Sequence, residues 1–550
     1  MKKYIIHLII ILVVLSSCKN NKQSNSNEIV KESETDLSAI ETKDFRDFKV
    51  LDSKYLKNNV IWSDLNKSLE DFEQEDYEAL KPLILEQEIA RLQKHIISGK
   101  LTYLKLTKFY LFRIRKYDRE NKLSLNSVIA INPNVIEEAK SKDQEFLNKK
   151  LKHPVFGMPI LLKDNINASG MPTTAGAIAL ANNVTDDAFV VKKLKESGAI
   201  ILGKANLSEW AYFFCGECPS GYSAVGGQTL NPYGRRVIDT GGSSSGSGVS
   251  VAANFCVAAV GSETAGSILS PASQNSVVGL KPTIGLLSRS GIIPISSTLD
   301  TSGPITKNVT DNAIMLDAMF GNDIRDNKSI VTKWSNNYYK INFNNSNLKG
   351  KRFGAYKRLL EDSLYVNAIK VLKEKGAIIV EIEEPKVELP DFVRLLNLDM
   401  QEDLPKYLSD FANSNITFKS VEDIINYNNQ DSLLRSPYGQ ALFKGVAEDK
   451  SSVEEFSKIK TKLKKNGEQF FNIPMKANNL DGFLSINNYH AASAAVAEYP
   501  AMTVPMGYTS VGEPKGITFI ASPLKELDIL NWAYIYEQAS KARIAPSNYN

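Results

Sequence analysis

Three short stretches of this 550-residue chain carry residue types that could do chemistry: GMPILLKDNI (157–166), TGGSSSGSG (240–248) and GSETAGSILSPA (261–272). In the first stretch, Lys163 follows an uncharged apolar run, which predicts a buried strand with a lysine at its end. Burial disfavours the charged ammonium, and a neutral lysine can act as a general base. Taken alone, the stretch is more typical of a lysine whose amine reaches solvent, so the other two stretches decide the interpretation.

The third stretch has the outline of a phosphate-binding loop, because four residues separate Gly261 from Gly266. Ser267 stands where such a loop requires lysine, which argues against nucleotide binding. Thr264, Ala265 and Gly266 are small and can turn tightly, so that several backbone N–H groups point at one place. A developing oxyanion requires that arrangement. The stretch therefore predicts an acyl-transfer site with a serine nucleophile.

The glycine- and serine-rich middle stretch supports other interpretations. A flexible linker is one, but the stretch lies between a turn and a small-residue helix rather than between domains. It also fits Gly-x-Ser-x-Gly centred on Ser244, the nucleophile elbow of α/β-hydrolases. Such an enzyme needs a downstream histidine, and His490 is the only one after that point. An esterase using Ser244 and His490 is therefore kept as an alternative. The scattered histidines lack metal-ligand spacing, so no metal is expected.

Helices and strands alternate around these stretches. Strands are predicted at 127–132 and 159–165, and a helix, a glycine turn and a strand over 188–206. This alternation predicts an α/β fold: a large mixed, mostly parallel β-sheet covered by helices on both faces.

The expected organisation is one large domain over 75–550. Its core comprises 88–320 and 481–545, and an elaborated middle region of 321–480 is rich in Asn and Lys. Within that middle region, 376–385 still has the pattern of a strand.

The N-terminus has the features of an exported protein. Two lysines precede an apolar run that is too short to span a membrane and ends in LSSC. This predicts a signal peptide over 1–17, and LSSC resembles the bacterial lipobox, which implies lipid attachment to Cys18. A flexible tether over 18–74 is expected to follow. The expected location is the bacterial cell envelope, with a lipid anchor in a membrane; a plain secretory signal is the alternative.

The formal net charge of +4 gives no electrostatic case for a nucleic-acid partner. Cys215 and Cys218 form a lone CGEC, which lacks the second pair of a structural zinc site. A redox pair is conceivable in an exported protein, but the default expectation is ordinary loop or core cysteines.

The three stretches together resemble the amidase signature family. The family has a lysine in G-[IV]-P-x-x-[VL]-K-D, a GGSS-[GS]-GS loop and a G-[ST]-[DE]-T-x-G-S-I turn. Here these are GMPILLKD, GGSSSGS and GSETAGSI, in the same order. Further matches are VVGLKPTIGLLSRSGIIPIS (277–296) and DTSGPITKNVTD (300–311). The resemblance implies the amidase signature fold.

The resemblance also implies a Ser–Ser–Lys triad. Neutral Lys163 would take a proton from Ser243, which takes one from Ser267. Ser267 would then attack an amide carbonyl and form an acyl-enzyme.

Supporting residues follow from the same resemblance. Backbone N–H groups of Thr264, Ala265 and Gly266 would hold the oxyanion. Ser262 occupies a hydroxyl position beside the lysine, and the peptide bond after Gly242 is expected to be cis. No metal or organic cofactor is implied.

Two departures from the family pattern concern specificity. Leu269 stands where many members carry arginine, and Ser485–Tyr489 replaces a usual Pro-Thr pair. The surrounding sequence looks most like the peptide amidase branch, which removes C-terminal amide groups. The expected substrate is a small-molecule or peptide amide. A non-catalytic ligand-binding lipoprotein on the same fold is the last alternative, and the sequence does not determine the oligomeric state.

Overall fold

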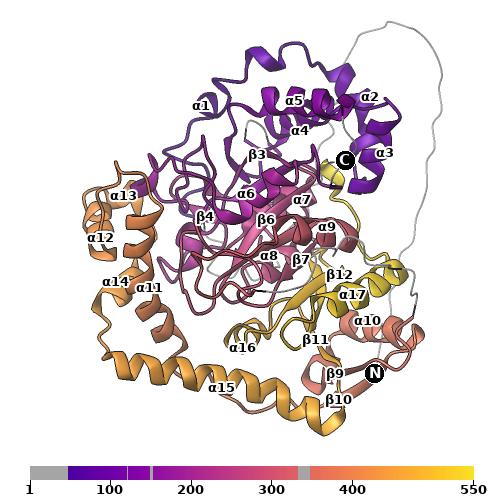
Figure 1. Ribbon diagram of the computed structural model, residues 1–550, viewed down its shortest axis with the longest axis vertical. Helices are drawn as coiled ribbons and strands as arrows, with labels where there is room; N and C mark the ends of the chain where they lie inside the picture. The colour runs from indigo at the N-terminus through magenta and orange to yellow at the C-terminus, as the bar shows by residue number, and fades with distance from the viewer. Residues whose placement is uncertain (1–47, 120–121, 149–152, 332–342, 344–346, 550) are drawn as a thin grey trace, which may run out of the picture. The chain divides into compact units, whose positions relative to one another are not determined.

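The computed structural model describes residues 48–119, 122–148, 153–331, 343 and 347–549. Its centre is a sheet with the spatial strand order β1-β3-β2-β6-β8-β7-β12-β13-β11-β9-β10 (Figure 1). A separate short ribbon pairs β4 (Tyr222–Ser223) with β5 (Gly227–Gln228). The strands of the large sheet are Val128–Ile131 (β1), Pro159–Lys163 (β2), Ile200–Ala205 (β3), Ala258–Glu263 (β6), Val278–Lys281 (β7), Thr301–Thr306 (β8), Arg352–Tyr356 (β9), Ile378–Ile382 (β10), Gly482–Ile486 (β11), Ala501–Tyr508 (β12) and Pro514–Ile520 (β13).

Helices flank this sheet, as the alternating pattern predicts, and the α/β fold is confirmed. The α-helices of the described residues are Asn58–Trp62 (α1), Gln74–Ile84 (α2), Ile89–Ile97 (α3), Tyr103–Tyr117 (α4), Val135–Asn148 (α5), Phe189–Glu196 (α6), Ser245–Ala252 (α7), Leu269–Gln274 (α8), Val309–Met319 (α9), Ser363–Glu374 (α10), Phe392–Asp410 (α11), Val421–Asn429 (α12), Ser432–Arg435 (α13), Ala441–Glu448 (α14), Val453–Asn478 (α15), Ala491–Val496 (α16) and Glu526–Ser540 (α17).

The expected parallel pairing occurs in two blocks, β3-β2-β6 and β11-β9-β10. In each block a helix crosses between parallel neighbours: α6 joins β2 to β3, and α10 joins β9 to β10. Between the blocks every neighbouring pair, from β6-β8 to β13-β11, is antiparallel. Among these pairs, the hairpin of β12 and β13 has the shortest connection.

The predicted tether of 18–74 is too long. Residues 48–74 lie within the folded unit and contain α1, and the side chains of Trp62, Leu65 and Leu69 are buried in the main core. The apolar residues of this segment are spaced between lysines and asparagines, so it lacks the regular periodicity that indicates a helix. The predicted signal peptide, Cys18 and the rest of the tether to residue 47 lie outside the described residues.

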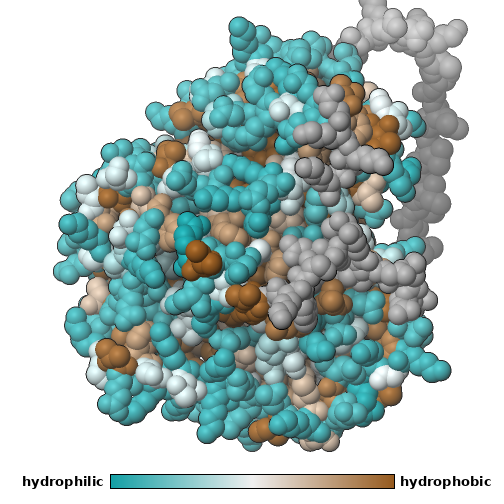
Figure 2. Space-filling view, in the orientation of Figure 1, coloured by the Kyte–Doolittle hydropathy of each residue, from teal (hydrophilic) through white to brown (hydrophobic). Residues whose placement is uncertain are grey.

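The middle region contributes to two places. β9, α10 and β10 extend the large sheet, whereas α11, α12, α14 and α15 enclose a second apolar core together with the segment after β3. The face in Figure 2 is mostly hydrophilic with scattered hydrophobic residues, as expected of a core-forming protein. Of the described helices, none combines the length and the apolar character that crossing a membrane would need.

Candidate active site

Lys163, the last residue of β2, is completely buried. Its Nζ lies 2.8 Å from Oγ of Ser243, 2.8 Å from Oγ of Ser262 and 3.0 Å from the carbonyl oxygen of Ser262. Ser262 is near the end of β6, which pairs in parallel with β2, so parallel strands place both side chains at one sheet edge. The structure thus brings Lys163, Ser243 and Ser262 into direct contact.

Burial lowers the pKa of Lys163 to about 7, although the carboxylates of Asp300 and Glu263 oppose that shift. An amine with this pKa is substantially neutral near pH 7 and has a free electron pair for a proton. Contrary to what the stretch taken alone favours, the amine does not reach solvent; this environment agrees with the neutral lysine that the resemblance implies.

Ser243 precedes α7 and is fully buried. The Gly242–Ser243 peptide bond is cis, as the resemblance implies. The backbone N–H of Ser208 donates to the carbonyl of Ser243 at 3.0 Å. A side chain on Gly242 would place its Cβ 2.5 Å from Oγ of Ser208, so this position requires glycine.

Ser267 lies in the turn that connects β6 to α8. Within the described part of the chain, the N–H groups of residues 264–267 have no protein acceptor, which leaves them available to an oxyanion. Gly266 has φ +100°, a conformation that favours glycine. The N–H of Ser244 donates to the carbonyl of Ser267 at 3.1 Å, so the two serine-bearing segments adjoin. Among the described residues, the Ser243 and Ser267 hydroxyls are not hydrogen-bonded to each other.

Glu263 fixes this turn, and the sequence analysis missed it. Its Oε2 accepts hydrogen bonds from the N–H groups of Ile268 at 2.7 Å and Leu269 at 3.0 Å. The carboxylate is buried. Its position inside GSETAGS was the available signal, but the pattern alone does not say that an acid at the end of β6 holds the residues after Ser267.

Asp300 and Asn165 are two further residues that sequence reasoning did not assign. Oγ1 of Thr264 donates to Asp300 at 2.5 Å. This bond holds the turn of residues 264–267, here called the oxyanion turn because of its predicted role, against the residue before β8. Nδ2 of Asn165 donates to Oγ of Ser262 at 2.9 Å. Both residues lie within quoted motifs, but their roles depend on contacts between distant segments.

The alternative pair of Ser244 and His490 is not assembled. Oγ of Ser244 donates to the carbonyl of Ser262 at 3.0 Å and accepts from the N–H of that residue. The buried His490 places Nδ1 2.6 Å from Oγ of Ser485 and Nε2 3.4 Å from Glu384. These separate partner sets give no support to a Ser–His esterase.

The two departures from the family pattern occupy different environments. Leu269 is buried in the main core at the start of α8 and does not line the hollow that opens beside Ser262 and Thr264. In the Ser485–Tyr489 segment, Asn488 packs on the oxyanion turn: a Cβ on Gly266 would lie 2.9 Å from its Nδ2. This segment therefore borders the turn that carries Ser267, the predicted nucleophile.

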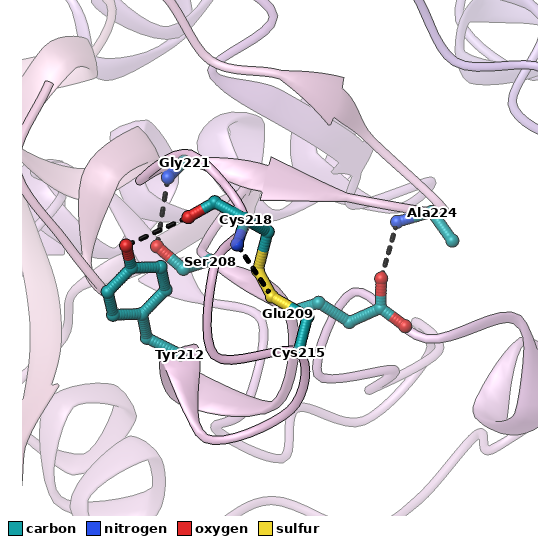
Figure 3. Close-up of a disulfide and its surroundings, with 7 residues drawn as sticks. All are labelled: Ser208, Glu209, Tyr212, Cys215, Cys218, Gly221 and Ala224. Carbon is teal, nitrogen blue, oxygen red and sulfur yellow. Dashed lines mark hydrogen bonds between the residues drawn. A yellow bond between two sulfur atoms is a disulfide. The ribbon is translucent and has the colours of Figure 1, made fainter. Parts of the chain in front are cut away.

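Cys215 and Cys218 form a disulfide, which corrects the default expectation of ordinary cysteines (Figure 3). The hydroxyl of Tyr212 donates to the carbonyl of Cys218 at 2.8 Å. The N–H of Gly221 donates to Oγ of Ser208 at 2.9 Å, which closes the loop onto the residue that binds Ser243 (Figure 3). The disulfide loop therefore adjoins the backbone of the predicted relay serine.

A hollow of about 390 Å³, here called the reaction pocket, opens beside Ser262 and Thr264. Its other polar lining residues include Arg289, Asp300 and Asp403. The volume falls within the range typical of small-molecule sites. In the described part of the chain, no group of three or more His, Cys, Asp or Glu side chains is arranged to hold a metal ion.

Comparisons with known proteins bear on the family and the fold of this chain. The model of the Amidase family matches residues 105–472. A "probable amidase" of Arabidopsis thaliana is 39% identical over 469 residues, which is 81% of this chain and 88% of that protein. The crystal structure of an amidase family protein from Bacillus anthracis has a TM-score of 0.86 at 37% identity, covering 90% of this chain and 99% of that one. The native peptide amidase of Stenotrophomonas maltophilia has a TM-score of 0.80 at 36% identity, covering 84% and 98%.

Proposed function

The chain belongs to the amidase family and is an amidase, and we propose on that premise that it cleaves a carboxamide C–N bond through an acyl-enzyme on Ser267. One observation carries the proposal. The buried Nζ of Lys163 lies 2.8 Å from Oγ of Ser243, on the segment that adjoins Ser267. A base, a relay hydroxyl and a nucleophile in this order need no imidazole.

In the proposed mechanism, the Ser267 hydroxyl gives its proton to Ser243 as Ser243 gives its own to Lys163. Oγ of Ser267 forms a bond to the amide carbon, and the carbonyl oxygen becomes an anion held by N–H groups of Thr264, Ala265 and Gly266. The C–N bond then breaks, and the proton on Lys163 returns through the relay to the leaving nitrogen. Water, deprotonated by the same relay, hydrolyses the ester.

The test is ammonia release from C-terminally amidated peptides and simple acyl amides by a chain lacking residues 1–18. We expect release by the wild type and a loss of at least about 10³-fold in Ser267→Ala. Labelling with a fluorophosphonate, followed by peptide mass spectrometry, should place the adduct on Ser267. An adduct on Ser244, together with loss of activity in His490→Ala, would establish the esterase alternative.

Peptide C-terminal amides are the substrate class we propose. The likeness to the peptide amidase of Stenotrophomonas maltophilia supports this choice, and the reaction pocket offers charged and polar groups suited to a peptide. Faster turnover of simple acyl amides than of any amidated peptide would contradict it. Absence of both turnover and labelling in a folded chain would favour the ligand-binding alternative.

We also propose export to the bacterial cell envelope with a lipid on Cys18. The Cys215–Cys218 disulfide supports an oxidising compartment, because cytosolic thiols are kept reduced. In a bacterial host, the full chain should partition with membranes and Cys18→Ser should not. Equal membrane association of the two chains would refute lipid attachment at this residue.

A further inference from the structure

A second hollow, of about 370 Å³, adjoins the reaction pocket. It is here called the lysine pocket. The two hollows share Ser297, Asn327 and Lys460 as lining residues. The walls of the lysine pocket come from the segment before β8, the segment after α9 that contains Lys328, and parts of α11, α15 and the end of α16. A molecule bound in the reaction pocket, beside Ser262 and Thr264, could therefore extend into the lysine pocket.

Lysine side chains dominate the charge of this second hollow. Nζ of Lys328 lies 2.8 Å from Oε1 of Glu498, and Nζ of Lys464 lies 2.8 Å from Oε2 of the same carboxylate. Two ammonium groups thus share one acid, which is the only acid among the described residues that line the pocket. The third lysine, Lys460, pairs with Asp399 at 3.0 Å.

These amines remain within reach of a ligand. The exposed fraction of the side chain is 30% for Lys328, 35% for Lys460 and 50% for Lys464. By contrast, the lining of the reaction pocket is balanced in charge, with four basic residues (Arg289, Arg325, Lys406 and Lys460) and four acidic residues (Asp300, Asp326, Glu402 and Asp403). The lysine pocket has three lysines against one glutamate, so it attracts a carboxylate on a bound substrate more strongly than the reaction pocket does.

We propose that the lysine pocket is a subsite for a carboxylate carried by the acyl part of the substrate, remote from the amide that is cleaved. This inference rests on the proposed function: release of ammonia from a terminal amide leaves all the rest of the peptide in the acyl part. The recognised substrates are amidated peptides with an acidic side chain upstream of the amidated residue.

The experiment uses acetylated alanine tetrapeptide amides in which Glu or Gln occupies each position in turn. We expect kcat/KM for Glu to exceed that for Gln by about two- to fivefold at one position distant from the amide. The preference should shrink with added salt, because exposed charges are screened. Equal values for Glu and Gln at every position would overturn the subsite.

Substitutions of residues that line the lysine pocket test whether the Glu preference arises there. Lys464→Gln should reduce the Glu preference towards unity, whereas Glu498→Gln should increase it by removing the competing carboxylate. Lys462→Gln is the matched control, because it makes the same charge change on the opposite face of the helix. An equal effect of Lys462→Gln and Lys464→Gln would overturn the assignment.

A measurement of peptide binding distinguishes a failure of this inference from a failure of the proposed function. Calorimetry with the Ser267→Ala chain and the same peptides reports the Glu preference without turnover. Preferential binding without hydrolysis of any peptide by the wild type would reject the proposed function and keep the subsite. Hydrolysis without a Glu preference would keep the proposed function and reject the subsite.

Discussion

Burial gives Lys163 the neutral amine that its proposed role as a base requires. With its amine surrounded by β2, β6 and the relay segment, desolvation lowers its pKa to about 7. Below that pH the amine is protonated and cannot accept the Ser243 proton. We therefore expect kcat/KM to rise with pH through an apparent pKa of about 7 and then level off.

The measurement is a pH–rate profile from about pH 5 to about pH 9. Asp403 needs a control, because burial raises its pKa to about 7 as well and it lines the reaction pocket. In Asp403→Asn the fall of kcat/KM below about pH 7, here called the acid limb, should persist. Its disappearance in that variant would assign the limb to Asp403 instead of Lys163.

Glu263 acts on the same amine and on the turn. Its carboxylate raises the pKa of Lys163, so Glu263→Gln should move the acid limb to lower pH. The variant keeps an acceptor oxygen for the N–H groups of Ile268 and Leu269 but weakens those bonds, so kcat should also fall. An acid limb that moves to higher pH would contradict the electrostatic assignment.

At the scale of elements, the loop after β3 is held by its disulfide. Cys215 and Cys218 are both buried, and the loop packs on α14 through the carbonyl of Phe214, which accepts from the N–H of Leu442 at 3.0 Å. Because few residues separate the two cysteines, the disulfide removes little entropy from the unfolded chain and so contributes modestly to stability. Cys215→Ser/Cys218→Ser should lower the free energy of unfolding by about 2 kcal/mol, measured by urea denaturation.

The number of reactive thiols tests whether the Cys215–Cys218 disulfide is present in solution. A chain lacking residues 1–18 retains three cysteines, of which Cys256 is free and buried. Denatured without reductant, it should expose one reactive thiol, and three after reduction. Three thiols before reduction would show that the pair is reduced in solution.

At the scale of the molecule, the N-terminal segment is part of the fold. Trp62 has an exposed fraction of 4%, and its side chain lies in the main core. Trp62→Ala should lower the free energy of unfolding by about 3–5 kcal/mol. A chain beginning at residue 48 should match the stability of one beginning at 19, while a chain beginning at 75 should be less stable by thermal denaturation.

Exposed Val60, on the same helix, supplies the control. Val60→Ala should leave the unfolding free energy nearly unchanged. Similar stability of the chains beginning at 48 and 75 would restore the longer tether that the sequence suggested.

Features that depend on local residue order could be predicted from the amino-acid sequence. The apolar run before Lys163 predicted a buried strand, and the small residues around Gly266 predicted a turn with free N–H groups. The burial of the lysine amine itself followed only from the three stretches together. The alternation of helices and strands predicted the α/β fold. Each of these depends on the side chains and φ/ψ preferences of neighbouring residues, which a single sequence displays directly.

Only the tertiary structure decided which distant segments meet. The register of β2 with β6 places Lys163 against Ser262, and the packing of the Ser485–Tyr489 segment brings Asn488 to the oxyanion turn. It also separated Ser244 from the partners of His490. Such contacts depend on strand order and on the packing of complete elements, because local periodicity fixes which face of a strand is buried but not which neighbour covers it.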